Sequence, residues 1–264
     1  MKVELIEWNK KQNKMQVLVN GVNDSFINLI RRFSIEEVPT LAIEDVEIRD
    51  NSSALYDEIV AHRLGLMPIK TDIKSYNTKE GCDCKGEGCA KCELKITLKA
   101  AKKGIIPASE AKSQDPKCTF VYEDMPIVKL ASKQKIELEA TAVMGMGKDH
   151  AKWVPGLVFY RKEVSIKTDG MKMDEAQKKK IQTICGELVS VTGGKVKVEK
   201  EKLSVSTGFD ACCAVLEEAG AVVTDTDNHI LIVESWGQLN CREILEYAAE
   251  IIIKKVDALE EQIK

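Results

Sequence analysis

The chain has 264 residues, of which 44% are hydrophobic and 31% are charged, the balance of a globular protein rather than a disordered one. A net charge of −3 provides no overall basic field, so any contact with DNA is expected to be local or made through partners. The apolar runs fall short of the roughly 20 residues that cross a bilayer, and the N-terminus lacks a signal peptide, so we expect a cytoplasmic protein without membrane contact.

The N-terminal part predicts a strand at 15–19, a helix, and a second strand at 41–48. Pro39 ends the helix, because the residue before a proline avoids helical geometry. One face of the helix carries apolar residues at helical spacing, namely Phe26, Ile30 and Phe33. This face is broad for so short a helix and must be buried against something.

The middle of the chain predicts a mostly β region with one short helix at 54–66. The helix ends near Gly65, and Pro68 follows it. A loop rich in glycine and cysteine is expected at 81–92. Strands are expected at 93–99, 117–122, 135–143 and 157–166.

The loop at 81–92 holds the densest chemical signal. Four cysteines fall within eleven residues, with glycines that permit tight turns: Cys82, Cys84, Cys89 and Cys92. Four sulfur ligands with no open position make a closed, structural metal site, whereas catalytic zinc keeps a place for water. We predict zinc here, with iron as the alternative metal and four unrelated thiols as the alternative to a metal site.

The other five cysteines form no C-x2-C pair: Cys118, Cys185, Cys212, Cys213 and Cys241. We expect them to be buried thiols that behave as small hydrophobic residues. Disulfides are not expected, because a reducing compartment keeps thiols reduced.

The composition changes near Thr168, where a compact α+β segment begins. Helices are predicted at 174–186 and 209–219, with two short strand-like runs within 195–205 and a further strand at 230–233. This order is that of a split βαβ unit.

The last segment predicts a helix of some 24 residues, roughly 36 Å long. Asn240 and Glu243 have the spacing of a capping box. One stripe carries Cys241, Leu245, Ala248, Ile252, Val256, Leu259 and Ile263. A core-packing helix is one interpretation, but the length and the extent of the stripe favour an interface with a partner.

No residue pattern predicts catalysis by this chain. Nucleophile-elbow and zinc-protease motifs are absent, and no aspartates cluster as a two-metal polymerase site requires. Arg31 and Arg32 interrupt the apolar N-terminal helix. They fit a solvated face and an interface equally well, since arginine is favoured for interface ion pairs.

Several segments together resemble one family. The segment Asn28-Leu29-Ile30-Arg31-Arg32 is similar to a motif shared by the α subunit of bacterial RNA polymerase, the D-type subunit of the archaeal enzyme and the third-largest subunit of eukaryotic RNA polymerase II. Further matches extend over most of the chain, at 37–40, at 57–59 followed by 61–68, at 137–140 with 147–153, and at 233–237.

The resemblance implies an α+β fold with a discontinuous dimerisation domain, an inserted mostly β domain and a small ferredoxin-like α+β domain. It implies the boundaries 1–40 with 223–264, 41–166, and 167–222. It also implies a non-catalytic assembly scaffold of archaeal DNA-directed RNA polymerase, in which Asn28, Arg31 and Arg32 are the assembly motif. The expected partners are subunit L as a heterodimer, small subunits N and P, and the large catalytic subunits, with DNA contacted only through the complex. The expected dimer interface is Phe26, Ile30, Phe33, Leu245, Ala248, Ile252 and Leu259.

The cysteine loop looks like the zinc loop of the eukaryotic subunit. Some archaeal members of the family bind an iron–sulfur cluster in the ferredoxin-like domain, but only Cys185, Cys212 and Cys213 remain there in this chain. We therefore predict that domain without a cluster. The alternative function is an iron–sulfur redox or redox-sensing protein that uses Cys82–Cys92; a DNA-binding protein is disfavoured by charge.

Overall fold

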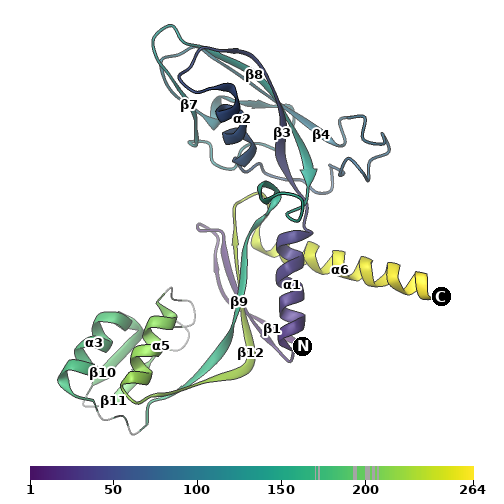
Figure 1. Cartoon of the computed structure of the whole chain (residues 1–264). Coiled ribbons are helices and arrows are strands. Elements are labelled where there is room, and N and C mark those ends of the chain that lie inside the picture. The colour runs from purple at the N-terminus through teal and green to yellow at the C-terminus, as the bar shows by residue number, and fades with distance from the viewer. Residues whose placement is uncertain (170, 172, 193–194, 200–202, 204–205, 207) are drawn as a thin grey trace. The chain divides into compact units, whose positions relative to one another are not determined.

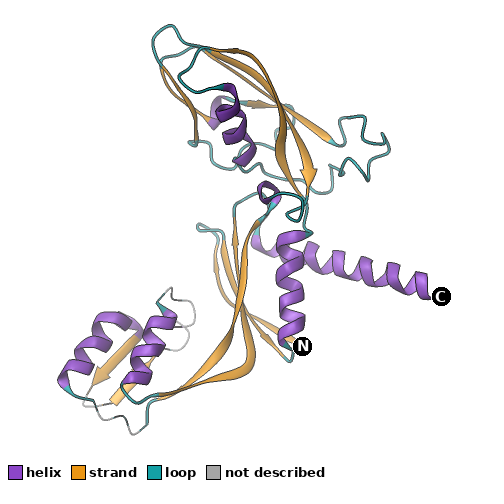
Figure 2. Ribbon diagram, in the orientation of Figure 1, coloured by secondary structure: helices purple, strands orange, loops and turns teal. Residues whose placement is uncertain are grey.

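The protein has a mixed α+β fold with several separate sheets (Figures 1 and 2). The computed structural model describes residues 1–264 except 170, 172, 193–194, 200–202, 204–205 and 207. Two compact units divide the chain: Met1–Asn28 with Phe159–Val233, and Leu29–Val158 with Glu234–Lys264. None of the described helices is long and apolar enough to cross a membrane.

The first unit is built on a four-stranded sheet of order β1-β2-β12-β9. Its strands are β1 (Lys2–Asn9), β2 (Lys14–Asn20), β9 (Gly156–Lys167) and β12 (Val222–Ser235). β1 and β2 pair antiparallel, with a bulge between Leu5 and Glu7. Alternate residues of β2, such as Val17 and Val19, are buried on one face. The predicted strands at 15–19, 157–166 and 230–233 are confirmed, while β1 was not predicted.

A small α+β region, residues 174–218, completes the first unit with its own core. Its elements are α3 (Glu175–Cys185), the 3-10 turn η3 (Gly186–Leu188), β10 (Val189–Thr192), β11 (Lys195–Val198) and α5 (Phe209–Glu218). Ile181, Cys185 and Leu216 are among its buried core residues. Both predicted helices are confirmed. β11 confirms the first strand-like run within 195–205, and the second falls largely on residues outside those described.

Two of the cysteines in the small α+β region are joined, which corrects the expectation of free thiols. Cys185 at the end of α3 and Cys212 in α5 form a disulfide with a Cα–Cα distance of 5.0 Å. Both are almost fully buried in the region's core. The expectation was wrong because it considered only the compartment, whereas packing of the two helices brings these residues together. Cys118, Cys213 and Cys241 are buried and form no disulfide, as expected.

The second unit contains a β-rich region, residues 40–158. Its main sheet has the order β3-β8-β4-β6, and β5 and β7 form a separate pair. Its elements are β3 (Thr40–Asn51), α2 (Asp57–Leu66), β4 (Glu93–Ala100), β5 (Gly104–Pro107), η1 (Ala108–Glu110), β6 (Lys112–Ser113), β7 (Pro126–Leu130), β8 (Ile136–Gly145) and η2 (Ala151–Trp153). A continuous hydrophobic core is shared by these elements, with Leu94, Ile127 and Leu138 among its buried residues. Figure 1 shows the short helix α2 beside the strands of this region.

The predicted strand at 117–122 is wrong. Within it only Phe120 pairs, through one isolated bridge to Ile69. A turn at Asp115 holds the N–H of Cys118, and a second turn joins Tyr122 to Met125, so too few residues remain for a strand. Cys118 and Phe120 are buried all the same, which explains the strand-like apolar pattern. The next strand along the chain is β7, which begins only at Pro126.

Two longer helices flank the β-rich region in sequence. α1 runs from Asp24 to Glu36, and α6 runs from Cys241 to Ile263. The predicted capping box of α6 is present: Asn240 accepts the N–H of Glu243 at 3.0 Å, and Glu243 accepts the N–H of Asn240 at 2.8 Å. In Figure 1 the C-terminal end of α6 points away from the other elements of its unit.

Candidate metal centre and candidate interface

The cysteine loop, residues 81–92, is a succession of tight turns. The N–H of Lys85 donates to the carbonyl of Cys82, and the N–H of Cys92 donates to the carbonyl of Cys89, both at 2.9 Å. Gly88 has a φ of +95°, and a Cβ there would lie 2.8 Å from the carboxylate of Glu93. Glycine is therefore favoured at this turn, because other residues rarely adopt that backbone, and a Cβ would also displace the end of the Glu93 side chain.

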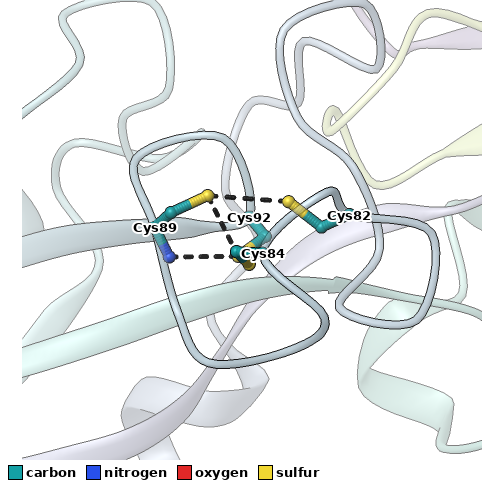
Figure 3. Close-up of side chains that lie close together, drawn as sticks. All are labelled: Cys82, Cys84, Cys89 and Cys92. Carbon is teal, nitrogen blue, oxygen red and sulfur yellow. Dashed lines mark hydrogen bonds between the residues drawn. The ribbon is translucent and has the colours of Figure 1, made fainter.

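These turns bring the four predicted ligands together (Figure 3). Their sulfur atoms all lie within 4.8 Å of one another. The Sγ–Sγ distances are 3.5 Å for Cys82–Cys89, 3.5 Å for Cys84–Cys92 and 3.7 Å for Cys89–Cys92. A tetrahedral zinc ion with Zn–S bonds near 2.3 Å separates its sulfurs by about 3.8 Å. The cluster therefore fits one tetrahedral ion with little adjustment.

The thiols of the cluster differ in acidity. A hydrogen bond from the Cys82 thiol and the N–H groups of Gly88 and Gly86 lower the pKa of Cys84 to about 6. Burial raises the pKa of Cys92 to about 12. A bound cation would favour the thiolate form of both.

The loop is fixed to its surroundings at both ends. The N–H of Asn77 donates to the carbonyl of Lys91 at 2.8 Å, and Lys79 forms an ion pair with Glu93 at 3.0 Å. Cys82 and Cys92 are buried while Cys84 and Cys89 are half-buried. Four sulfurs around one point leave no position for substrate or water, so the arrangement suits a structural ion rather than a catalytic one.

The predicted interface residues of α1 lie on a face that the chain itself leaves partly uncovered. Ile27, on a different side of the helix, is buried in the chain's own core. Phe26 is 37% exposed, and Ile30 and Phe33 are half-buried. Leu29, on the same face, is 36% exposed. α1 thus carries two apolar faces, of which only one is satisfied within the chain.

The α6 stripe divides in the middle of the helix. Its first residues are covered by the chain: Cys241 and Ala248 are buried, and Leu245 and Ile252 are half-buried. Ala248 therefore packs the chain's own core and has no area left to offer a partner. Beyond Ile252 the stripe is uncovered, with Val256 at 58%, Leu259 at 57% and Ile263 at 77% exposure.

Contacts not foreseen from the sequence hold α6 to the end of α1. Lys255 forms an ion pair with Glu37 at 2.9 Å and lies 5.2 Å above the ring of Phe33. Burial opposes the ionisation of Glu37, but hydrogen bonds from Lys255 and Lys148 outweigh it and keep the pKa of Glu37 below its usual value. Because Glu37 and Lys255 are far apart in the sequence, no periodic pattern indicates their pairing, and the sequence alone could not predict it.

The residues of the Asn28 motif take different environments. Asn28 and Arg31 are half-buried, whereas Arg32 is exposed. Arg32 forms an ion pair with Glu36, one helical turn later, at 3.0 Å. The motif residues therefore lie on α1 at the border between its buried side and its solvent-exposed side.

Comparison with known proteins gives one consistent result. Residues 46–155 match the model of the RNA polymerase Rpb3/RpoA insert domain. The chain is 35% identical to DNA-directed RNA polymerase subunit Rpo3 of Methanosphaera stadtmanae, with 97% of this chain and 96% of that one covered. It is 33% identical to Rpo3 of Methanosarcina acetivorans, with 98% and 97% covered. It is 32% identical to Rpo3 of Pyrococcus horikoshii, with 97% and 95% covered.

Proposed function

The chain belongs to the Rpb3/RpoA family of DNA-directed RNA polymerase subunits, and from this premise we propose that it is the archaeal D-type assembly scaffold of that enzyme. In this role it acts in the cytoplasm, pairs with the small subunit L, and carries subunits N and P and the large catalytic subunits. The active site belongs to those large subunits. In the described part of the chain, the one group of side chains arranged to hold a metal is the closed cysteine cluster, which supports a non-catalytic role.

The observation that carries this proposal is the uncovered half of the α6 stripe. Val256, Leu259 and Ile263 are more than half exposed at helical spacing, and α1 adds Phe26 and Leu29. Burying a large apolar side chain contributes about 1.5–3 kcal/mol, so several of them together can hold a permanent heterodimer. The proposed interface with L therefore includes Phe26, Ile30, Phe33, Leu245, Ile252 and Leu259, is extended along α6 by Val256 and Ile263, and is supported from the core by Ala248.

The Asn28 motif has a proposed role beside that interface. Arg32 is exposed, and it holds Glu36 through two hydrogen bonds, from Nε at 3.2 Å and from a terminal nitrogen at 3.0 Å. The pair lies at the surface, where a carboxylate of another subunit would be able to reach the remaining N–H groups of the guanidinium. We assign Asn28, Arg31 and Arg32 to contacts made during polymerase assembly.

The cysteine cluster is proposed to hold one zinc ion. Its four sulfurs and their spacing support a tetrahedral ion, and borderline-soft zinc favours thiolates. A bound ion would supply cross-links that hold the loop 81–92 in one conformation. The iron–sulfur redox alternative finds no support, since none of the three relatives compared carries a redox name.

The heterodimer is tested with a charged double variant of α6, Val256→Glu with Leu259→Glu. The chain and its variants are co-expressed with L and analysed by size-exclusion chromatography with light scattering. We expect a one-to-one complex for the natural chain and its loss in the variant, because two carboxylates would be buried without partners. Lys254→Glu, an exposed charge change next to the stripe, is the matched control and should keep the complex. If the double variant still formed the full complex with L, the exposed half of α6 would not be part of the interface.

A further inference from the structure

One side chain joins three segments of the second unit that lie far apart in the sequence. Glu37 directly follows α1, and it forms ion pairs with Lys148 of the β-rich region at 3.3 Å and with Lys255 of α6 at 2.9 Å. Each lysine takes a different carboxylate oxygen, Oε2 for Lys148 and Oε1 for Lys255. We call these three residues the Glu37 bridge. It connects the end of α1, the β-rich region and α6 through one carboxylate.

The carboxylate of the Glu37 bridge is more protected from water than that of an ordinary surface ion pair. The side chain of Glu37 is only 16% exposed, whereas those of Lys148 and Lys255 are about half exposed. A carboxylate with so little contact with water needs partners in order to stay charged. Neutralising Glu37 would therefore release both lysines at once.

The lysine that the β-rich region contributes is fixed by its backbone. The N–H of Lys148 donates to the carbonyl of Glu36, in the last turn of α1, at 3.0 Å. A Cβ on the preceding Gly147 would lie only 2.0 Å from the carbonyl oxygen of Ile35, so glycine is needed for this close approach. The segment before Lys148 therefore rests directly on the end of α1, and the ammonium group has little freedom to leave Glu37.

The lysine that α6 contributes stands where the covered half of the helix meets the uncovered half. Ile252 is half-buried, whereas Val256, next to Lys255, is 58% exposed. Lys255 also lies 5.2 Å above the ring of Phe33, a residue of the proposed interface. Beyond Lys255, the described part of α6 has no ion pair with another element, since the pair of Lys264 lies within the helix. The Glu37 bridge is thus the last ionic attachment of α6 before its exposed stripe.

We propose that Glu37 is a positioning residue for the heterodimer with L. By holding Lys148 and Lys255 together, it fixes the exposed half of α6 relative to the end of α1 and to the β-rich region before L binds. L has to bury apolar residues of both helices at once, so a fixed arrangement reduces the ordering that binding would otherwise require. This inference rests on the proposed function, because the role is defined by the binding of L.

A positioning role differs in its kinetics from a role in the fold alone. A chain whose α6 is poorly placed binds L only during the fraction of time in which the helix is correctly placed, so the association rate constant falls while the dissociation rate constant is unchanged. A role in the fold alone would lower the free energy of unfolding and leave both rate constants unchanged. A direct contact with L would instead speed dissociation.

The test measures the binding of purified L to the immobilised full-length chain by surface plasmon resonance. Glu37→Gln keeps the shape of the side chain and removes its charge, and it should lower the association rate constant about tenfold, because two charge-assisted hydrogen bonds are lost. Lys148→Met changes no residue of the proposed interface and should lower the association rate constant about threefold. In the Glu37→Gln background, Lys148→Met should have no further effect, because the charge that it pairs with is already gone.

Long-range attraction between charges is the main competing cause of a changed association rate. Glu37→Gln and Lys148→Met change the net charge in opposite directions, so such attraction would move the two rates in opposite directions, whereas loss of the bridge lowers both. Glu137→Gln is the matched control. It breaks another ion pair of the β-rich region, with Lys99 at 3.0 Å, and should leave the association rate unchanged.

Three results would overturn the positioning role. They are an unchanged association rate in Glu37→Gln, opposite shifts in the two single variants, and faster dissociation with unchanged association. Urea unfolding of each variant is measured first, and Lys148→Met, at a side chain that is 45% exposed, decides the question if Glu37→Gln does not fold. If the natural chain binds L and the variants bind equally fast, only the positioning role fails; if the natural chain does not bind L, the scaffold proposal fails with it.

Discussion

The β-rich region and the distal half of α6 use the same apolar residue types at regular spacing, with opposite results. In the β-rich region Leu94, Ile127 and Leu138 are almost completely buried by their own sheet and helix. In α6 the stripe is covered only as far as Ile252, and Leu259 beyond it is exposed. A region that covers its apolar residues can fold by itself, whereas one that leaves them in water needs a second molecule.

The cysteine cluster, like the β-rich region, is formed entirely by residues of this chain. Structural zinc in small peptides binds with an apparent free energy of about 10–16 kcal/mol, so losing a ligand should be the largest change available to this loop. We expect Cys92→Ser to lose the metal and to open residues 81–92 to proteolysis, while binding to L is kept. Metal analysis and limited digestion measure both effects.

Cys118→Ala is the control for the metal experiment. Cys118 is buried in the same region but lies outside the cluster, so its substitution should leave the metal content unchanged. Full metal retention by Cys92→Ser would contradict the four-sulfur site. Loss of L binding in that variant would contradict the independence of the two regions.

Matched leucine truncations put the comparison to a direct energetic test. Leu94→Ala removes a fully buried side chain and should lower the unfolding free energy of the isolated chain by about 2–5 kcal/mol. Leu259→Ala removes an exposed one and should change it by less than about 0.5 kcal/mol. Urea unfolding measures both. Equal destabilisation would show that the distal half of α6 is packed by the chain itself.

Removing the disulfide of the small α+β region should destabilise that region alone. Its closed loop spans a sequence separation of 27, which by chain entropy stabilises the region by about 3–4 kcal/mol. Cys212→Ser, or a reductant, should speed hydrogen exchange in α3 and α5 without changing it in the β-rich region. Cys213→Ser alters the adjacent free thiol and serves as the control. Unchanged exchange in Cys212→Ser would mean that the core alone holds the two helices.

Local chemistry made much of the fold predictable. Asn240 and Glu243 indicated the start of α6, and the capping box is present. The spacing of Cys82, Cys84, Cys89 and Cys92 predicted their convergence, since only neighbouring residues and permissive glycines were involved. The apolar stripe of α6 was visible as a period, although the sequence could not show that it changes from buried to exposed near Ile252.

What could not be predicted depends on contacts between residues far apart in the chain. Phe120 looked like part of a strand, but its side chain is buried in the hydrophobic core and its backbone makes only one bridge, to Ile69, some fifty positions away. Cys185 and Cys212 are joined because two helices pack together, which no local pattern encodes. The pairing of Glu37 with Lys255 likewise arises only once their unit has folded.

Hydrogen exchange of α6 with and without subunit L tests the central claim most directly. The scaffold account predicts that the amides of residues 253–263 exchange fast in the isolated chain and become strongly protected when L is added, because their apolar side chains are then buried. The amides of the β-rich core should be slow in both states. Binding of L with no change at 253–263, or no binding at all, would contradict the account.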